Sequence, residues 1–238
     1  MIACLAISHY TTAHYKKSLF AALGKTLRSN MSKPRTEKHT VEYLDTLALQ
    51  STHPAVKKLK RQGSEPSIHG NKVWRSSFVL MNYMEDYPLP KRARVLDIGC
   101  GWGLTGIYMA RRFDARVTGI DADADVQPFL DAQADINGVK IKFEKKKFHQ
   151  IRKKDMAGVH TIIGGDVCFW DELVQPLYRL VDRAMKSGVK QVLIADPGRS
   201  PFWELAERCE EKFNASVVEH RISKPYKTSK HILVVRPG

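Results

Sequence analysis

The sequence predicts an α/β protein with a doubly wound, mostly parallel sheet, and three observations point to that fold. An apolar strand, Val95–Ile98, runs into a glycine-rich turn that opens an amphipathic helix. Strand and helix patterns then alternate as far as Phe213, as they do in a parallel sheet covered by helices. Two last strands, Ser216–Ile222 and His231–Val235, are joined by a polar turn and predict a closing antiparallel hairpin.

The elements before the glycine-rich turn are predicted from apolar spacing and from helix-capping residues. Spaced apolar residues over 37–49 predict a helix, and Thr52 with Pro54 predicts the cap and first turn of a second, short helix. Val73–Tyr87 is a strongly apolar helix that ends before Pro88.

The domain organisation follows from these patterns. We expect residues 1–69 to form a basic, partly helical N-terminal extension, mobile over residues 1–36, and residues 70–238 to form the main domain. Met31 is an alternative start of the chain, since a polar stretch follows it.

The elements after the turn alternate in type. The predicted helices are Leu104–Phe113, Ala124–Ile136, Asp171–Lys186 and Pro201–Phe213. The predicted strands between them are Arg116–Ile120, Lys140–Phe143, His160–Gly164 and Gln191–Ala195. In such a sheet, ligands bind beyond the carboxyl ends of the strands.

The charge of the chain is strongly basic, with a formal net charge of +14 over 238 residues. The excess is concentrated in residues 1–94 and again between Lys140 and Lys154. A basic surface favours acidic partners, either nucleic acid or an acidic protein patch. A solvated basic face without a partner is the alternative.

Other bulk features exclude several classes of protein. No apolar run approaches the roughly 20 residues that a membrane span needs, so we expect no membrane association. The four cysteines are scattered without a C-x-x-C pair, and the nine histidines lack ligand spacing. We therefore expect neither a metal site nor a disulfide framework, and a cytoplasmic protein.

The glycine-rich turn, Gly99-Cys100-Gly101-Trp102-Gly103, predicts a cofactor site. Glycines let the backbone turn sharply and let a ligand approach, and the helix behind them offers unpaired N–H groups. Gly101, Gly103 and Gly106 also fit the G-x-G-x-x-G pattern of dinucleotide sites, with Asp121 at the end of the next strand.

Two features favour a different cofactor. Asp97, two residues before the first glycine, would repel a pyrophosphate but attract an ammonium group. The tight G-x-G-x-G spacing and the second acid, Asp121, fit S-adenosylmethionine, which carries an amino acid, a sulfonium and a ribose but no phosphate.

The residues VLDIGCGWG and the later GID resemble motif I and the ribose-binding acid of class I S-adenosylmethionine-dependent methyltransferases. This resemblance implies a seven-stranded sheet, to which the closing hairpin belongs. It implies that Asp97, Gly99, Gly101 and Gly103 surround the methionine part and that Asp121 accepts hydrogen bonds from the ribose. We expect the Trp102 ring to cover the ligand or an adjacent helix.

Three further segments resemble protein-lysine methyltransferases of this class. Asp166-Val167-Cys168-Phe169 resembles their D-x-x-[YF] motif, and the run NKVWRSSFVLMNYM resembles their tryptophan-bearing helix. The run from Asp196 to Pro201, DPGRSP, resembles a segment of the branch that methylates the electron-transfer flavoprotein β-subunit.

These segments imply roles for Trp74, Asp166 and Phe169, and the loop after the third strand suggests one for Phe148. Asp166 would hold the incoming lysine ammonium, and Phe169 would form an apolar wall that favours the neutral amine. Trp74 would line the cofactor pocket. In the loop after the third strand, Phe148 would stack on the adenine, whereas no residue there is identified as the partner of the adenine amino group.

The predicted function is transfer of a methyl group from S-adenosylmethionine to a lysine of a protein with an acidic surface. The alternatives are an RNA or small-molecule amine acceptor and a binding module without catalysis. No N/D-P-P-[YF] motif of nucleobase amino-group methyltransferases is present in the sequence.

Overall fold

The computed structural model describes residues 38–66 and 69–237. The chain separates into two units, Met1–Thr36 and Glu37–Gly238, and every described residue belongs to the second. The expectations of a mobile start and of an alternative start at Met31 lie outside the described residues. The expected boundary near residue 70 stays a prediction.

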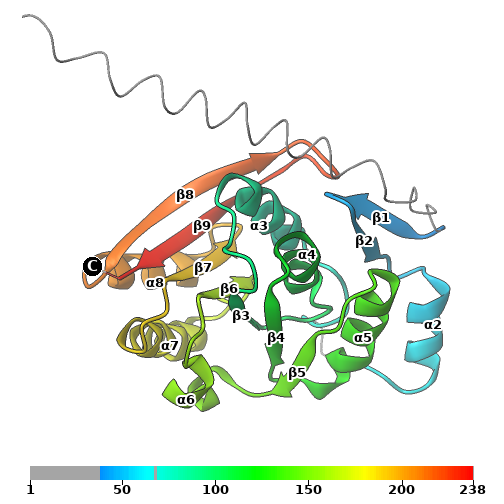
Figure 1. The fold of residues 1–238 in the computed structure, drawn as a ribbon, viewed down its shortest axis with the longest axis horizontal. Coiled ribbons are helices and arrows are strands. Elements are labelled where there is room, and N and C mark those ends of the chain that lie inside the picture. The colour runs from blue at the N-terminus through cyan, green and yellow to red at the C-terminus, as the bar shows by residue number, and fades with distance from the viewer. Residues whose placement is uncertain (1–37, 67–68, 238) are drawn as a thin grey trace, which may run out of the picture. The chain divides into compact units, whose positions relative to one another are not determined.

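A seven-stranded sheet forms the centre of the second unit, as the sequence predicted (Figure 1). The structure shows the strand order to be β5-β4-β3-β6-β7-β9-β8. The first five strands in this order are parallel, and β9 runs antiparallel to both β7 and β8. The strands are β3 (Arg94–Ile98), β4 (Arg116–Asp121), β5 (Lys142–Lys145), β6 (Thr161–Gly165), β7 (Gln191–Asp196), β8 (Asn214–Ile222) and β9 (Thr228–Arg236).

Helices pack against the sheet through two apolar clusters. Consecutive residues of a central strand point to opposite faces, so Val95 packs in the cluster with α3 and α4 while Leu96 packs in the cluster with α7 and α8. The helices are α2 (Pro54–Arg61), α3 (Arg75–Asp86), α4 (Leu104–Phe113), α5 (Gln127–Ile136), α6 (Lys153–Met156), α7 (Val174–Lys186) and α8 (Ser200–Glu210).

The segment before α2 corrects one prediction. In place of a helix over residues 37–49, the chain forms an antiparallel hairpin of β1 (Thr40–Tyr43) and β2 (Thr46–Leu49). Leu44 and Asp45 both adopt positive φ angles, of 49° and 58°, which is the conformation of the tight turns that join two strands.

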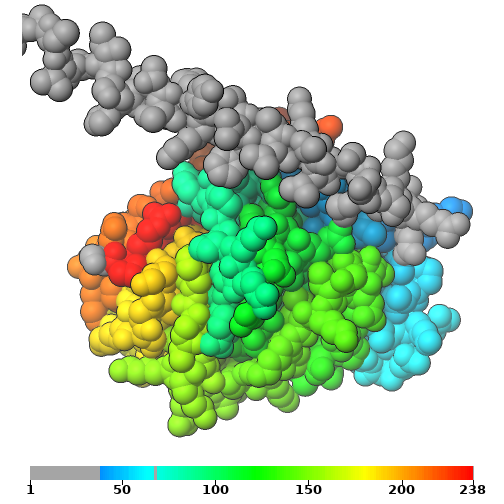
Figure 2. All heavy atoms as spheres, viewed as in Figure 1, coloured from blue at the N-terminus to red at the C-terminus, as the bar shows by residue number. Residues whose placement is uncertain are grey.

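Helix α5 supplies the reason why this hairpin forms. Gln133 lies on α5, Asn137 is the residue that caps its C-terminal end, and both side chains are buried. The Leu47 N–H donates to Asn137 Oδ1 at 2.9 Å, and the Leu49 N–H donates to Gln133 Oε1 at 2.8 Å. The two amides therefore act as a neighbouring strand would. The space-filling view shows this blue segment against the green atoms of the main domain (Figure 2).

Smaller differences concern element ends. His53, not Thr52, caps α2: its Nδ1 accepts the Ala55 N–H at 3.2 Å, and Pro54 takes the first helical position. Strand β5 begins two residues later than predicted.

The described residues lack a membrane-spanning helix and a cluster of metal-ligating side chains. Within residues 38–66 and 69–237, no helix is long and apolar enough to cross a membrane. Over the same ranges, no group of three or more His, Cys, Asp or Glu side chains is placed to hold a metal ion.

Candidate active site

The turn between β3 and α4 is held by a buried carboxylate. Asp97 is 5% exposed, and its Oδ2 accepts the Gly106 N–H of the first turn of α4 at 3.1 Å. A Cβ at Gly106 would lie 3.0 Å from this oxygen and 2.8 Å from Val117 Cγ1. Only a glycine lets the helix approach the strand this closely.

Burial dominates the protonation of Asp97. Loss of water contact raises the pKa of this carboxyl to about 8, the negative charge of Asp121 adds to the rise, and the Gly106 hydrogen bond opposes it. A cationic group placed beside Asp97 would favour the ionised form. The site is therefore suited to the ammonium end of an amino acid.

Asp121, at the end of β4, is tied to the same turn. Its Oδ2 accepts the Gly101 N–H and its Oδ1 accepts the Asp123 N–H, each at 3.0 Å. Burial raises the pKa of Asp121, and these backbone hydrogen bonds oppose the rise. The structure thus brings the two predicted acids and the glycine-rich turn together.

The turn also leaves room for a ligand. Gly99, Gly101 and Gly103 all have positive φ, and a Cβ added at Gly101 would meet no atom within 4 Å. Two acids beside an open glycine turn fit the ammonium and ribose of S-adenosylmethionine. Asp97, Gly99, Gly101 and Gly103 would hold the methionine part, and Asp121 would hold the ribose.

Trp102 has a packing role. Its side chain is 2% exposed, it stacks on Phe129 of α5 with ring centroids 5.1 Å apart, and its Nε1 donates to Gly70 O at 2.8 Å. Of the two positions expected for this ring, the structure shows the one over an adjacent helix.

Phe148 lies in the short turn after β5, on the side of Asp121. The Lys146 N–H donates to Asp121 O at 2.8 Å, which sets this loop beside the strand end. The Phe148 ring is half-buried and packs against the α7 cluster, and its backbone oxygen accepts from Arg183 at 2.8 Å. Its stacking on an adenine stays a prediction.

Asp166 follows β6 in a strained conformation. Its φ is +56°, and its N–H donates to Ala195 O at 2.8 Å. Its side chain is 6% exposed; Oδ1 lies 3.2 Å from Arg199 Nη2. Oδ2 is buried and has no hydrogen-bond partner among the described residues. A buried carboxylate oxygen without a donor is costly unless a ligand supplies one.

Arg199 and Asp196 complete this group and were given no role in the sequence analysis. Arg199 Nη1 lies 2.7 Å from Oδ2 of Asp196, which is fully buried, so the guanidinium bridges two acids. Oδ1 of Asp196 accepts the N–H groups of Gly198 and Arg199, each at 2.9 Å. The DPGR run was the available signal, but the sequence does not show that Arg199 reaches Asp166.

Aromatic rings lie beside Asp166. Phe169 stacks on His69 with ring centroids 4.1 Å apart and contacts the exposed Trp170 at 4.7 Å. Trp74 Nε1 donates to His69 O at 2.8 Å, so the predicted Trp74 and Phe169 belong to one cluster. His69 is a member that the sequence analysis missed, because no motif marks it.

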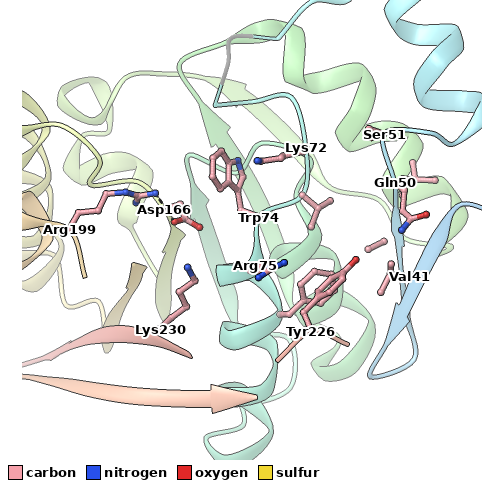
Figure 3. A pocket seen from close by; sticks show the side chains of 14 residues that line it. Val41, Gln50, Ser51, Lys72, Trp74, Arg75, Asp166, Arg199, Tyr226 and Lys230 are labelled. Atoms are coloured by element: carbon pink, nitrogen blue, oxygen red, sulfur yellow. Dashed lines mark hydrogen bonds and ion pairs between the residues drawn. The ribbon is translucent and has the colours of Figure 1, made fainter. Parts of the chain in front are cut away.

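A cavity of about 530 Å³ opens beside this cluster. Figure 3 shows Arg199 reaching Asp166 on one side, with Trp74 and Lys72 above and Lys230 below. Asp97, Asp121 and Phe148 are not among its lining residues, which are Val41, Ala48, Leu49, Gln50, Ser51, Lys72, Val73, Trp74, Arg75, Phe78, Asp166, Arg199, Tyr226 and Lys230. The cavity thus adjoins Asp166 and is distinct from the glycine-rich turn.

Comparisons with known proteins agree with the cofactor assignment. Residues 95–188 match the model of a family described as a methyltransferase domain. The chain is 31% identical over 125 residues to phosphoethanolamine N-methyltransferase 1 of Arabidopsis thaliana, covering 52% of this chain. The chain spans about a quarter of that relative's length.

Solved structures show the same fold at low identity. The structure of precorrin-6y C5,15-methyltransferase from Geobacter metallireducens has a TM-score of 0.53 at 12% identity, over 68% of this chain and 87% of that one. Ribosomal protein L11 methylase from Lactobacillus delbrueckii subsp. bulgaricus has a TM-score of 0.52 at 15% identity, over 69% and 80%.

Residues 95–188 match a methyltransferase domain, and the seven-stranded sheet has the fold of solved methyltransferases. This match and this fold imply S-adenosylmethionine as the methyl donor.

Proposed function

We propose that the protein transfers a methyl group from S-adenosylmethionine to the side-chain amine of a lysine in another protein. The observation that carries the proposal is the free Oδ2 of Asp166, buried at the end of β6 beside an open cavity. A lysine ammonium would supply the donor that this oxygen lacks. The resemblance of Asp166–Phe169 to the D-x-x-[YF] motif supports the same acceptor.

The residues around Asp166 suit each requirement of the transfer. A lysine ammonium, with a usual pKa of about 10.4, must lose a proton before its nitrogen can attack. The Asp166 carboxylate would accept a hydrogen bond from the nitrogen and orient its lone pair, while the His69 and Phe169 rings exclude water and favour the neutral amine.

The chemistry supplied by the bound cofactor is an activated methyl group on a sulfonium. Transfer to the neutral amine would leave S-adenosylhomocysteine and a methylated ammonium, the proton of the incoming lysine having passed to solvent beforehand. In-line placement at near-attack distance accounts for much of the rate in such a reaction. Arg199 would hold Asp166 in place from the side opposite the free oxygen.

A small amine that carries a phosphate is a second candidate acceptor. The specific observation in its favour is the 31% identity to a phosphoethanolamine N-methyltransferase. Both candidates are amines, and both would use Asp166 in the same way.

The compartment we propose is the cytoplasm. The three cysteines in the described ranges, Cys100, Cys168 and Cys209, are all free. Free buried thiols are typical of reducing compartments.

Radiolabelled methyl transfer into a cell extract tests the acceptor class. The full chain is incubated with extract and labelled S-adenosylmethionine, and the product is divided between protease, ribonuclease and filtration. We expect protease-sensitive label that acid hydrolysis releases as methyl-lysine. Label in the filtrate would favour the small amine, and ribonuclease-sensitive label would favour RNA; either result overturns the lysine acceptor.

A further inference from the structure

Positively charged side chains predominate among the charged residues that line the cavity beside Asp166. Four cationic side chains line it, whereas Asp166 is its single acidic lining residue. Arg199 is already paired with Asp166 and Asp196. Lys72, Arg75 and Lys230 form no ion pair with any residue in 38–66 or 69–237.

Aromatic contacts hold two of these cations without neutralising them. Lys72 Nζ lies 4.3 Å from the ring centroid of Trp74, and the Arg75 guanidinium carbon lies 5.3 Å from that of Tyr226. Lys230 projects from β9 below Asp166 (Figure 3). The cations therefore reach the cavity from two segments that lie far apart in the sequence.

Lysine binding alone does not account for these charges. A lysine ammonium that approaches Asp166 meets three cations of the same cavity that have no ion-pair partner in the described part of the chain, and like charges repel at this range. An acceptor with negative groups beside its lysine would pair with the cations and remove that repulsion. The net charge of +14 acts in the same direction over longer distances.

We infer that the acceptor lysine is flanked by acidic residues, and that Lys72, Arg75 and Lys230 bind their carboxylates while Asp166 receives the ammonium. This inference rests on the proposed lysine acceptor and specifies it. The partner is an acidic protein segment that enters the cavity. Phosphoethanolamine carries a negatively charged phosphate that could bind the same cations, so the test compares it with the acidic peptide.

The test uses two short peptides that differ only in flanking charge, acetyl-Glu-Lys-Glu-amide and acetyl-Gln-Lys-Gln-amide, together with phosphoethanolamine. Binding to the full chain saturated with S-adenosylhomocysteine is measured by calorimetry, and methyl transfer is measured as kcat/KM. Two double variants with the same net charge are compared: Lys72→Gln with Lys230→Gln, and Lys91→Gln with Lys227→Gln, two exposed lysines outside the cavity lining.

We expect the acidic peptide to bind the wild type and the control variant about tenfold more tightly than the neutral one, which partly exposed ion pairs can supply. The cavity variant should lose this preference, and added salt should weaken it in the wild type.

Several outcomes overturn the inference. Equal binding of the two peptides to the wild type contradicts it, as does a preference that the cavity variant retains. Loss of S-adenosylhomocysteine binding in the cavity variant with an unchanged peptide preference would assign the cations to the cofactor instead.

The lysine proposal fails separately from this inference. A preference for the acidic peptide without methyl transfer to it supports the anion subsite but contradicts lysine methylation by this site. Binding and methylation of phosphoethanolamine, with no binding of either peptide, overturns both.

Discussion

The cofactor side of the site and the acceptor side treat their charged groups in opposite ways. Around the glycine-rich turn, Asp97 and Asp121 are held by backbone N–H groups of nearby residues. On the acceptor side, Asp166 keeps an oxygen without a partner in the described residues, beside cations that lack ion pairs there. The first arrangement is built by one local segment, and the second depends on groups that a ligand must bring.

Different stability costs follow from this contrast. Backbone hydrogen bonds offset only part of the cost of burying the two acids by the turn, since burial still raises both pKa values. The acceptor side depends instead on the bridge through Arg199. Substitutions on the two sides should therefore differ in how far they lower the free energy of unfolding and in whether they weaken cofactor binding.

Among losses of stability measured at one pH, the largest is expected at Arg199, the single side chain that bridges two buried acids on the acceptor side. Arg199→Gln removes the cation between Asp166 and fully buried Asp196, so two buried acids lose their partner. We expect the free energy of unfolding to fall by about 3 kcal/mol in urea denaturation. Arg208→Gln is the matched control, since it removes an exposed pair with Glu204 on the same helix, and should cost less than about 1 kcal/mol. Equal losses of unfolding free energy in the two variants would show that the Arg199 bridge stabilises the fold no more than an exposed ion pair does.

A smaller effect is expected from crowding the cofactor turn. The Cβ of Gly99→Ala would lie 2.6 Å from Val167 Cγ1 at a φ of +59°. We expect a loss of about 2 kcal/mol in unfolding free energy and weaker S-adenosylhomocysteine binding by calorimetry. The control Gly138→Ala has a φ of +65° and open space, so it should cost about 1 kcal/mol and leave binding intact. Equal affinity of the two variants for S-adenosylhomocysteine would show that Gly99 is not needed to form the cofactor site.

A third effect, which depends on pH, is expected from Asp97. Burial raises its pKa from 3.8 to about 8, so the folded protein holds a proton that the unfolded chain releases in this range. The contribution of Asp97 to unfolding free energy is therefore greatest below pH 4 and is lost as the pH rises to about 8.

The variant Asp97→Asn isolates this contribution. Relative to the wild type, it should gain stability steadily from pH 5 to pH 8 in urea denaturation without cofactor. The pKa of Asp182 is lowered by hydrogen bonds from Lys186 and Lys212, so Asp182→Asn should shift the curve by a constant amount over this range. Parallel curves for Asp97→Asn and the wild type would contradict the raised pKa.

The cofactor side of the site could be predicted from the sequence more fully than the acceptor side. The cofactor side could be predicted because its acids, its turn and the strand that ends at Asp121 lie within Arg94–Asp121, where periodicity and glycine spacing act locally. The mostly parallel sheet and the closing hairpin could be predicted for the same reason, since apolar strands alternate with helices along the chain and two strands with a polar turn end it.

The rest depends on contacts between distant segments. Residues 37–49 have helix-like apolar spacing, yet Thr40–Leu49 form a hairpin that bonds to Gln133 of α5 and to Asn137 at the end of α5. The acceptor side gathers His69, Arg199 and Lys230 from three parts of the chain, and only folding brings them near Asp166. Local patterns do not contain this information.

The most direct test of the account is whether Asp166 serves the acceptor and not the cofactor. Asn tolerates the positive φ of this position, so Asp166→Asn removes the charge while the backbone is kept. The exposed Asp171 provides the control Asp171→Asn.

Labelled methyl transfer and S-adenosylhomocysteine binding are measured on both variants. We expect Asp166→Asn to slow transfer by about 100-fold or more with cofactor affinity unchanged, and Asp171→Asn to match the wild type. Undiminished transfer in Asp166→Asn, or loss of cofactor binding with it, would contradict the division of the site into two halves.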